Sequence, residues 1–268
     1  MANKKGKIIT ITSCKGGVGK SILTMDLAGV FHLMKLKVLV IDLDLYSGSL
    51  ATYMNSKNDK TIFNLIDDFA YNRYKNIDDY IYKVNENISL IASPKDPRQA
   101  YKIDAKYIPL LLTNVVYKYD VILIDTDHAL NDIKLVTLDN CDAKLFVLTD
   151  DVFDLKNSRS FFSIAKDIGM QNIYTVLNKS INTNNSHFSM YDMKNILKTN
   201  IDFVIPESMY VKNIESYIMD SKILALNKKV TSKKDLKLIE SIARTLISWK
   251  ESSSYEKDMD WYISSWYK

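Results

Sequence analysis

The chain has 268 residues, of which 47% are hydrophobic and 25% charged, proportions that exclude a disordered, collagen-like or small disulfide-stapled protein. Its net charge of +4 comes from lysines scattered among acids, and this is too weak to indicate nucleic-acid binding by charge alone. The two cysteines and three histidines show no metal-ligand spacing. No apolar window approaches the ~18 residues of a membrane-spanning helix, and the basic N-terminus leads into a short strand unlike a signal peptide. We therefore predict a cytoplasmic protein.

Apolar, β-branched runs alternate with segments of helical period along the whole chain. This pattern predicts an α/β fold with a single doubly wound, mostly parallel sheet flanked by helices. The predicted strands are Lys7–Ser13, Lys37–Asp42, Ile88–Ala92, Asp120–Asp125, Lys144–Thr149, Ile173–Leu177 and Phe203–Ile205. The predicted helices are Lys20–Met34, Thr61–Phe69, Ile77–Val84, Asp104–Val116, Asp132–Leu138, Leu155–Ile168, Met190–Thr199, Val211–Met219 and Lys233–Trp249.

We predict one domain over residues 1–249 and an attached aromatic tail over residues 250–268. The polar stretch Ser180–Ser189 follows a predicted strand, and its asparagine and serine content is typical of a surface loop.

Glycine is concentrated in one place, since three of the seven glycines lie within four residues of the segment Cys14–Ser21. This segment follows a predicted strand and opens a predicted helix, the setting in which a glycine-rich loop wraps phosphate with its backbone N–H groups. In that loop Lys20 can reach the β- and γ-phosphates, and the Ser21 hydroxyl is a suitable ligand for Mg²⁺. The predicted phosphate-binding residues are Gly16, Gly17, Val18, Gly19, Lys20, Ser21 and Ile22.

A second lysine, Lys15, begins the same loop and completes the pattern KGGxGK[ST]. With it the sequence resembles the deviant Walker A P-loop ATPases of the ParA/MinD family. The resemblance implies ATP or ADP and Mg²⁺ as cofactors, slow ATP hydrolysis, and a homodimer with ATP in its interface. It also implies that Lys15 crosses to the partner's nucleotide and neutralises charge in the transition state.

Two further predicted strands end in carboxylates, VLVIDLD at Val38–Asp44 and VILIDT at Val121–Thr126. Ligands of open parallel sheets bind beyond the carboxyl ends of the strands. By resemblance, Asp44 orients the attacking water and is a candidate Mg²⁺ ligand, while Asp125 holds Mg²⁺ through water. Asp42 either helps to organise this site or caps the turn that follows it.

Asn178 ends a predicted strand in the sequence VLNKS. The family uses an asparagine there to recognise adenine, and an amide with both donor and acceptor suits that base. The alternative is an ordinary asparagine at a strand-end turn. Pro206 and Glu207 match the family segment that covers the other side of the purine.

The resemblance covers about residues 5–248 and, by its runs, is greatest to the CpaE/TadZ branch, whose ATPases position and help to assemble Tad-type pili. The runs that carry it are DLDLYSGSL, LIASPKDP, DTDHAL and TDDVFDLKNSRSF. This branch implies a protein partner in a pilus or secretion system. The chain departs from it at Tyr46, where glutamine is usual, and at Ser49, where an acid is usual.

Three alternatives remain open. A ParA-like ATPase would bind DNA through Lys228, Lys229, Lys233, Lys234 and Lys237, although a solvated helix end also explains that cluster. A MinD-like ATPase would act at the division site. A bacterial tyrosine kinase shares the fold and a C-terminal tyrosine cluster, but it lacks the lysine that Lys15 supplies here.

In the tail, Met259, Tyr262, Ile263 and Trp266 follow the spacing of an amphipathic helix, which a membrane surface could bind. The segment Lys250–Lys268 nevertheless carries three lysines against four acids, and anionic lipid repels such a charge. We therefore favour packing of the tail onto the protein's own body or onto a partner chain.

Overall fold

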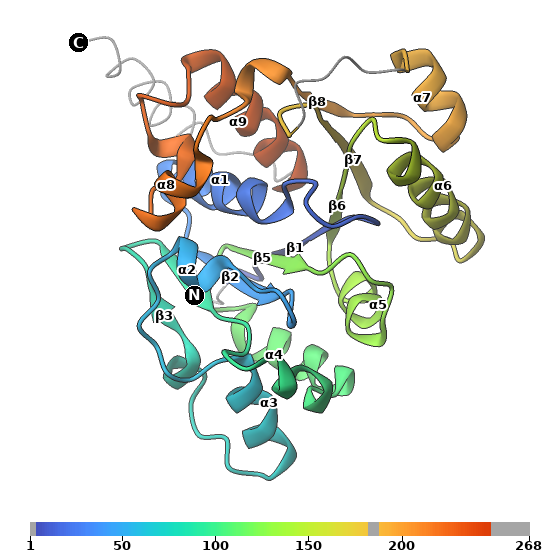
Figure 1. Cartoon of the computed structure of the whole chain (residues 1–268). Helices are drawn as coiled ribbons and strands as arrows, with labels where there is room; N and C mark the ends of the chain where they lie inside the picture. Colours follow the sequence, from blue (N-terminus) through green and yellow to red (C-terminus); the bar gives the residue numbers. More distant parts are fainter. Residues whose placement is uncertain (1–3, 182–187, 248–268) are drawn as a thin grey trace.

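The computed structural model describes residues 4–181 and 188–247. Within them one eight-stranded sheet has the order β3-β4-β2-β5-β1-β6-β7-β8 (Figure 1). All neighbouring strands are parallel except β3 and β4. The strands are β1 (Lys7–Thr12), β2 (Val38–Leu43), β3 (Tyr82–Lys83), β4 (Ile88–Ile91), β5 (Val121–Thr126), β6 (Ala143–Leu148), β7 (Ile173–Asn178) and β8 (Phe203–Ile205).

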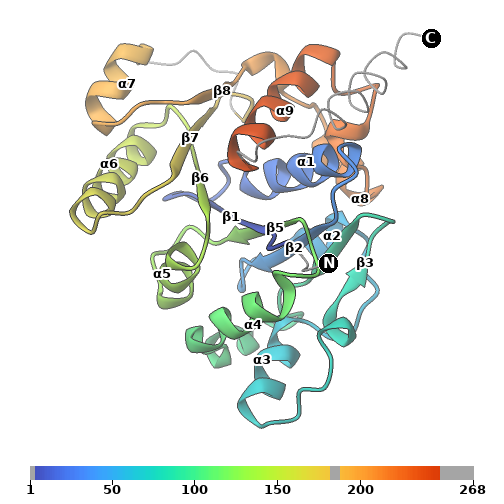
Figure 2. The same ribbon diagram turned by 180° about the vertical axis from the view of Figure 1, so that it is seen from behind.

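Helices cover both faces of this sheet, as the two opposite views show (Figures 1 and 2). The predicted doubly wound, mostly parallel α/β fold is therefore confirmed. The α-helices of the described residues are α1 (Lys20–Leu33), α2 (Leu50–Tyr53), α3 (Ile62–Ala70), α4 (Ile108–Val115), α5 (Asp132–Asp139), α6 (Val152–Asp167), α7 (Met190–Leu197), α8 (Ile214–Met219) and α9 (Lys233–Ile247).

The core divides into layers because successive side chains of a strand point to opposite faces of the sheet. Val38 and Val40 of β2 pack with α1 and α9, whereas Leu39 and Ile41 pack with α3 and α4. The far half of the second face is closed by α6 and α7, which pack around Phe146. The central strands are buried on both sides, and their near-continuous apolar runs follow from that.

The predicted helix Ile77–Val84 is wrong. Only a 3₁₀ turn forms at Ile77–Tyr80, and the chain then continues as β3, antiparallel to β4. The Asn85 side chain accepts hydrogen bonds from the N–H groups of Asn87 and Ile88 and so closes the tight turn between these strands. The helical period of Ile77–Val84 led to the wrong prediction, because it carries no information on the hydrogen bonds that β3 forms with β4 at the sheet edge.

Three helices begin three or more residues from the predicted start, and one of them, α8, begins at Ile214 and not at Val211. A 3₁₀ turn at Ala105–Tyr107 precedes α4, whose first turn contains Pro109. Helix α6 begins at Val152, before the predicted Leu155, because the Asp151 side chain accepts hydrogen bonds from the N–H groups of Phe153 and Asp154.

The tail 250–268 lies outside the described residues, as do residues 182–187 of the predicted loop Ser180–Ser189. The prediction of a domain boundary near residue 249 stays a prediction. Among the residues that the structure describes, no helix has the length and apolarity needed to cross a membrane.

Candidate functional site

The glycine-rich loop connects the end of β1 to the start of α1 (Figure 1). Gly17 and Gly19 have φ angles of 74° and 93°, in the left-handed region where a Cβ is strained. A Cβ on Gly19 would also lie 2.5 Å from the amide nitrogen of Asn178. The loop therefore requires glycine at these two positions, and its path brings backbone N–H groups together at the N-terminus of α1.

Lys20 is folded back inside this loop. It is 7% exposed, and its ammonium donates a hydrogen bond of 3.0 Å to the Ser13 hydroxyl. That hydroxyl in turn donates to the carbonyl of Lys15, at 2.7 Å. The loop thus holds the Lys20 ammonium on its inner side, and the predicted contact of this lysine with phosphate stays a prediction.

Ser21 and Asp125 meet directly, although they are 104 residues apart in the chain. The Ser21 hydroxyl donates a hydrogen bond of 2.6 Å to Asp125 Oδ2. Burial raises the pKa of Asp125 to about 7, and the hydrogen bond from Ser21 and the charge of Lys20 offset part of that effect.

The other oxygen of Asp125, Oδ1, is buried and has no hydrogen-bond partner among the residues that the structure describes. A buried carboxylate oxygen beside a hydroxyl is a donor set that suits Mg²⁺, since this ion takes hard oxygen ligands and keeps several waters. The residues present therefore fit Mg²⁺, for which Ser21 would be a ligand and Asp125 would bind through water.

Asp42 is fully buried at the end of β2, and both its oxygens accept hydrogen bonds. Oδ1 accepts from the N–H of Asp44 at 3.1 Å. Oδ2 accepts from the N–H of Leu50 at 3.2 Å and from the Ser93 hydroxyl at 3.1 Å. Burial and the nearby charge of Asp125 raise the pKa of Asp42 well above its usual range. Of the two roles left open by the sequence, these contacts are those of a turn cap.

Asp44 follows in that turn and is half-buried. Its Oδ1 accepts a hydrogen bond from the N–H of Ser47 at 3.2 Å. Asp44 lines a cavity of about 700 Å³ together with Gly16, Gly17, Lys20 and Ser21. The structure thus brings Gly16, Gly17, Lys20, Ser21 and Asp44 to one cavity, and Asp125 adjoins it through its hydrogen bond with Ser21.

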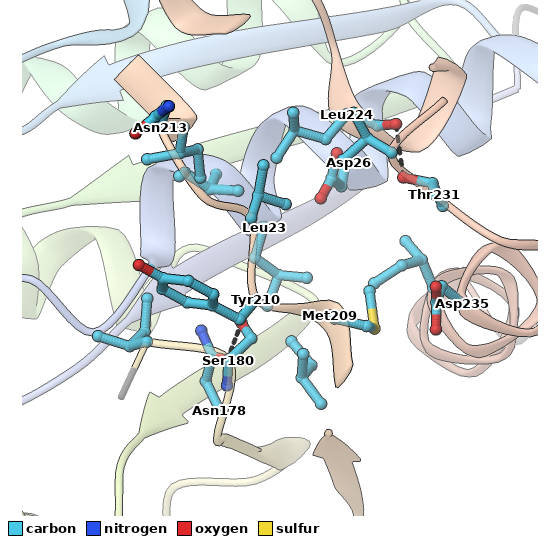
Figure 3. A pocket seen from close by; sticks show the side chains of 18 of the residues that line it. Leu23, Asp26, Asn178, Ser180, Met209, Tyr210, Asn213, Leu224, Thr231 and Asp235 are labelled. Atoms are coloured by element: carbon cyan, nitrogen blue, oxygen red, sulfur yellow. Dashed lines mark hydrogen bonds between the residues drawn. The ribbon is translucent and has the colours of Figure 1, made fainter. Parts of the chain in front are cut away.

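A second cavity, of about 350 Å³, lies on the other side of the loop, and Gly19, Ile22 and Ile181 line both. Its walls come from α1, the end of β7, the segment around Tyr210 and the start of α9 (Figure 3). Apolar side chains dominate the lining, as in most sites for flat organic ligands. The first cavity thus carries the loop lysine Lys20 and the carboxylate of Asp44, and most of the residues that line the second are apolar.

Asn178 lines the second cavity and is 5% exposed. Its Nδ2 donates to the carbonyl of Val18 at 3.0 Å, and its Oδ1 accepts from the N–H and the hydroxyl of Ser180. These bonds tie the β7 turn to the phosphate loop. The predicted contact of this amide with adenine stays a prediction.

Pro206 and Glu207 follow β8 and begin the segment that covers the second cavity. The side chains that line that cavity come a few residues later, from Met209 and Tyr210 (Figure 3). Glu207 is exposed, and Pro206 accepts a hydrogen bond from the N–H of Met209 through its carbonyl. The predicted purine contacts of Pro206 and Glu207 stay predictions.

Lys15 differs from Lys20 in its surroundings. Its ammonium lies 3.1 Å from Asp151 Oδ1, and the two side chains are 42% and 38% exposed. Asp151 caps the N-terminus of α6, and its pKa is lowered first by the hydrogen bond from Asp154 and then by Lys15. Lys15 is therefore accessible at the surface, where a second chain could meet it.

Three residues of the site were not singled out from the sequence. Asp127 and Asn131 line the phosphate-side cavity, and Lys134 on α5 is 1% exposed beneath it. A lysine within a short helix gives no local signal of burial, because helical period alone does not show which cations turn inward. Only the run DTDH after β5 could have directed attention to Asp127.

A family model described as an AAA domain matches residues 6–166, which is more than half of the chain and includes the phosphate loop, Asp44 and Asp125. These are the P-loop ATPases of the ParA/MinD type. The chain belongs to this family. The predicted family is thereby confirmed, whereas the match gives no support to the CpaE/TadZ branch in particular.

Curated relatives of this ParA/MinD-family chain include an uncharacterised ATP-binding protein of Methanocaldococcus jannaschii, 25% identical over 207 residues. That alignment covers 77% of this chain and 76% of the relative. A protein of Emiliania huxleyi named as a putative septum site-determining protein MinD is 23% identical and is aligned over 81% of this chain and 82% of its own.

Several solved structures share the fold of this chain. A ParA family ATPase from Chlorobium tepidum has a TM-score of 0.75 at 19% identity, covering 88% of this chain and 98% of its own. MinD from Pyrococcus horikoshii, solved with Mg-ADP, has a TM-score of 0.73 at 21% identity, covering 89% and 95%. A plasmid partition protein from Borrelia burgdorferi, bound to AMPPNP, has a TM-score of 0.69 at 26% identity, covering 91% and 99%.

Proposed function

We propose that this protein is an ATP-dependent dimerisation switch. One chain binds ATP with Mg²⁺, pairs with a second copy so that the nucleotide lies in the interface, and hydrolyses ATP to ADP and phosphate. Hydrolysis removes the contacts that favour the pair, so the two states differ in their affinity for a partner.

The observation that supports this proposal is the separation of the two loop lysines. Lys20 is buried in the loop against Ser13, where it can serve the chain's own phosphates. Lys15 is exposed and forms a surface ion pair with Asp151. Such exposed pairs contribute at most about 1 kcal/mol, so Lys15 can leave Asp151 for a partner's nucleotide.

The remaining roles follow from the positions of the carboxylates. Asp44 lines the phosphate-side cavity. Its carboxylate accepts a hydrogen bond from the water that attacks the γ-phosphate and so orients this water for in-line displacement. Ser21 and Asp125 would hold Mg²⁺, which when bound neutralises charge on the phosphates. Lys20 supplies a second positive charge at the same end of the site.

For the cellular role we propose positioning of a large structure, as in the MinD and plasmid partition proteins to which the chain is similar. These relatives support the division-site and partition alternatives better than the Tad-pilus role predicted from the CpaE/TadZ runs. The pilus role and its protein partner have no support among the relatives described above.

Sedimentation velocity with ATP, with ADP and without nucleotide tests the switch. We expect a dimer with Mg-ATP that returns to a monomer as phosphate is released, and a monomer in the other two conditions. A sedimentation coefficient that is the same in all three conditions would contradict the proposal, provided that ATP binding is verified in the same samples.

DNA binding separates the partition role from the division-site role. A partition ATPase should shift DNA only with ATP and lose that binding as salt rises, because phosphate contacts release counterions. Four lysines near the start of α9, Lys228, Lys229, Lys234 and Lys237, are exposed and could make such contacts. Absence of an ATP-dependent shift at low salt would leave the division-site role as the better proposal.

A further inference from the structure

One buried cation lies directly beneath the phosphate-side cavity. Lys134 of α5 is 1% exposed, and its ammonium donates to the carbonyl of Ser13 at 2.7 Å. The same ammonium donates to the carbonyl of His128 at 3.3 Å and lies 3.5 Å from that of Asp127. Ser13 begins the phosphate loop, whereas Asp127 and His128 follow the predicted metal-binding Asp125. A single side chain therefore joins the two segments that border the phosphates.

Asn131 reinforces this connection from the first turn of the same helix. Its Oδ1 accepts the N–H of Lys134 at 2.9 Å, and its Nδ2 donates to Asp127 Oδ2 at 3.1 Å. Asp127 is 9% exposed, and burial raises its pKa. Helix α5 and its cap residue thus hold the segment after β5 through the carbonyls of Asp127 and His128 and through the carboxylate of Asp127.

The connection also reaches Lys20. The Ser13 residue whose carbonyl accepts from Lys134 is the one whose hydroxyl accepts from Lys20. Asp127 and His128 line the cavity that Lys20, Ser21 and Asp44 line. A displacement of Lys134 would therefore change both sides of the cavity without touching a nucleotide.

A buried ammonium is costly unless its donors are satisfied, and an apolar side chain of similar volume would fill this space without that cost. Here three carbonyl oxygens converge on the three N–H donors of the ammonium. Burial lowers the pKa of Lys134 to about 8, so Lys134 is protonated in most molecules at neutral pH. The ammonium connects Ser13 to Asp127 and His128. Packing of the core alone would not require a charged side chain at this position.

We propose that Lys134 is a positioning residue for ATP hydrolysis, which fixes the segment after Asp125 against the start of the phosphate loop. This inference rests on the proposed ATPase function. Because the Lys134 ammonium donates to backbone carbonyls and does not line the phosphate-side cavity of the described residues, its loss should affect the rate of the chemical step more than nucleotide binding. Misplacement of catalytic groups by about 1 Å can cost on the order of 100-fold in rate.

The test compares steady-state ATP hydrolysis by the full chain with Lys134→Met, Lys134→Arg and Lys144→Met. Lys144 is a matched control, since it is 7% exposed and its ammonium lies 3.5 Å from the Cys141 carbonyl, on β6 and outside both cavities. We expect Lys134→Met to lower kcat at least 10-fold with KM within about threefold of wild type. Lys134→Arg should restore part of kcat, and Lys144→Met should keep the wild-type kcat.

Thermal unfolding of each variant separates positioning from stability. If Lys134→Met is not folded, Lys134→Gln, which keeps amide donors, should show the same fall in kcat at near-normal KM. A folded Lys134→Met or Lys134→Gln protein with wild-type kcat would overturn the inference, as would an equal loss in Lys144→Met. If the wild-type chain itself binds ATP but does not hydrolyse it, the proposed ATPase function fails, and the inference falls with it for that separate reason.

Discussion

At the scale of single residues, the two lysines of the phosphate loop have opposite surroundings. Lys20 is buried and bonded to Ser13, whereas Lys15 is exposed and pairs with Asp151 on α6. A buried ammonium is fixed in place by its own loop, but an exposed one can exchange partners at little cost. The two lysines are therefore expected to act at different stages of the cycle.

Lys20→Ala should abolish nucleotide binding, because it removes the buried loop ammonium that is proposed to bind the phosphates of the nucleotide in the same chain. Lys15→Ala should bind ATP with near-normal affinity but fail to dimerise. Nucleotide affinity and sedimentation, measured on the same preparations, check both expectations. Normal ATP-dependent dimerisation of Lys15→Ala would show that Lys15 does not act across the interface.

Asp44→Ala should bind Mg-ATP and hydrolyse it about 100-fold or more slowly, since the attacking water loses its carboxylate while the phosphate loop stays intact. A long-lived dimer should then accumulate. Ser47→Ala is a suitable control, because Ser47 donates only its backbone N–H to Asp44 and keeps that bond in the variant. Near-normal turnover of Asp44→Ala would assign the role to another residue.

At the scale of elements, α1 packs against the C-terminal part of the domain through a close contact. The Asp26 carboxylate accepts the N–H of Ala225 at 2.8 Å, in the 3₁₀ turn Leu224–Leu226. Nearby, a Cβ at Gly29 would lie 2.8 Å from Ile223. Asp26 also lines the apolar cavity (Figure 3). One buried acid thus connects the phosphate-loop helix to the wall of the second cavity.

This acid should make stability depend on pH. Burial raises the pKa of Asp26 from 3.8 to about 7, so between these values the folded state binds more protons than the unfolded state. The contribution of Asp26 is therefore present near pH 4 and is lost as pH rises to 7. Asp26→Asn keeps an oxygen for Ala225 without the charge, and it should be more stable than wild type at pH 8 by on the order of 4 kcal/mol.

Urea unfolding at pH 4.5 and pH 8 measures this difference. The gain from Asp26→Asn should be small at pH 4.5 and large at pH 8. The exposed Asp139→Asn is the control, and it should change stability by no more than a few tenths of a kcal/mol at either pH. An equal effect of Asp26→Asn at both pH values would contradict the expectation.

At the scale of the whole molecule, the parallel sheet brings distant segments to one edge. β1, β2, β5 and β7 end at the phosphate loop, at the Asp42–Asp44 turn, at Asp125 and at Asn178. Parallel strands joined by helices all present their carboxyl ends on the same side, where ligands bind. The site is therefore a property of the sheet order, with β2, β5 and β1 adjacent.

The aromatic tail, residues 250–268, is expected to pack onto the protein's own body or onto a partner chain. Deletion of Tyr255–Lys268 should lower thermal stability or partner binding, because aromatic side chains are common anchors of such contacts. It should not change association with anionic liposomes, since the tail carries a net negative charge. Liposome flotation of the full chain and the deletion, with and without ATP, checks this. Flotation that needs both ATP and the tail would favour the membrane alternative.

The sequence by itself determined the class of fold, the central strands, the phosphate loop and the carboxylates at the strand ends. These features depend on neighbouring residues, because period, spacing and glycine content are local properties. Gly17, Gly19 and Lys20 could be identified on such grounds, and the structure places them between the end of β1 and the first turn of α1.

Only the tertiary structure decided the role of Asp42 as a turn cap, the formation of β3 at the sheet edge, and the burial of Lys134. Two of these depend on a partner far away in the chain: Ser93 is 51 residues from Asp42, and Ser13 is 121 residues from Lys134. Strand β3 pairs with the nearby β4, and β4 takes its place in the sheet by pairing with β2. No local pattern carries that information, since a buried polar group is defined by the acceptors that fold around it.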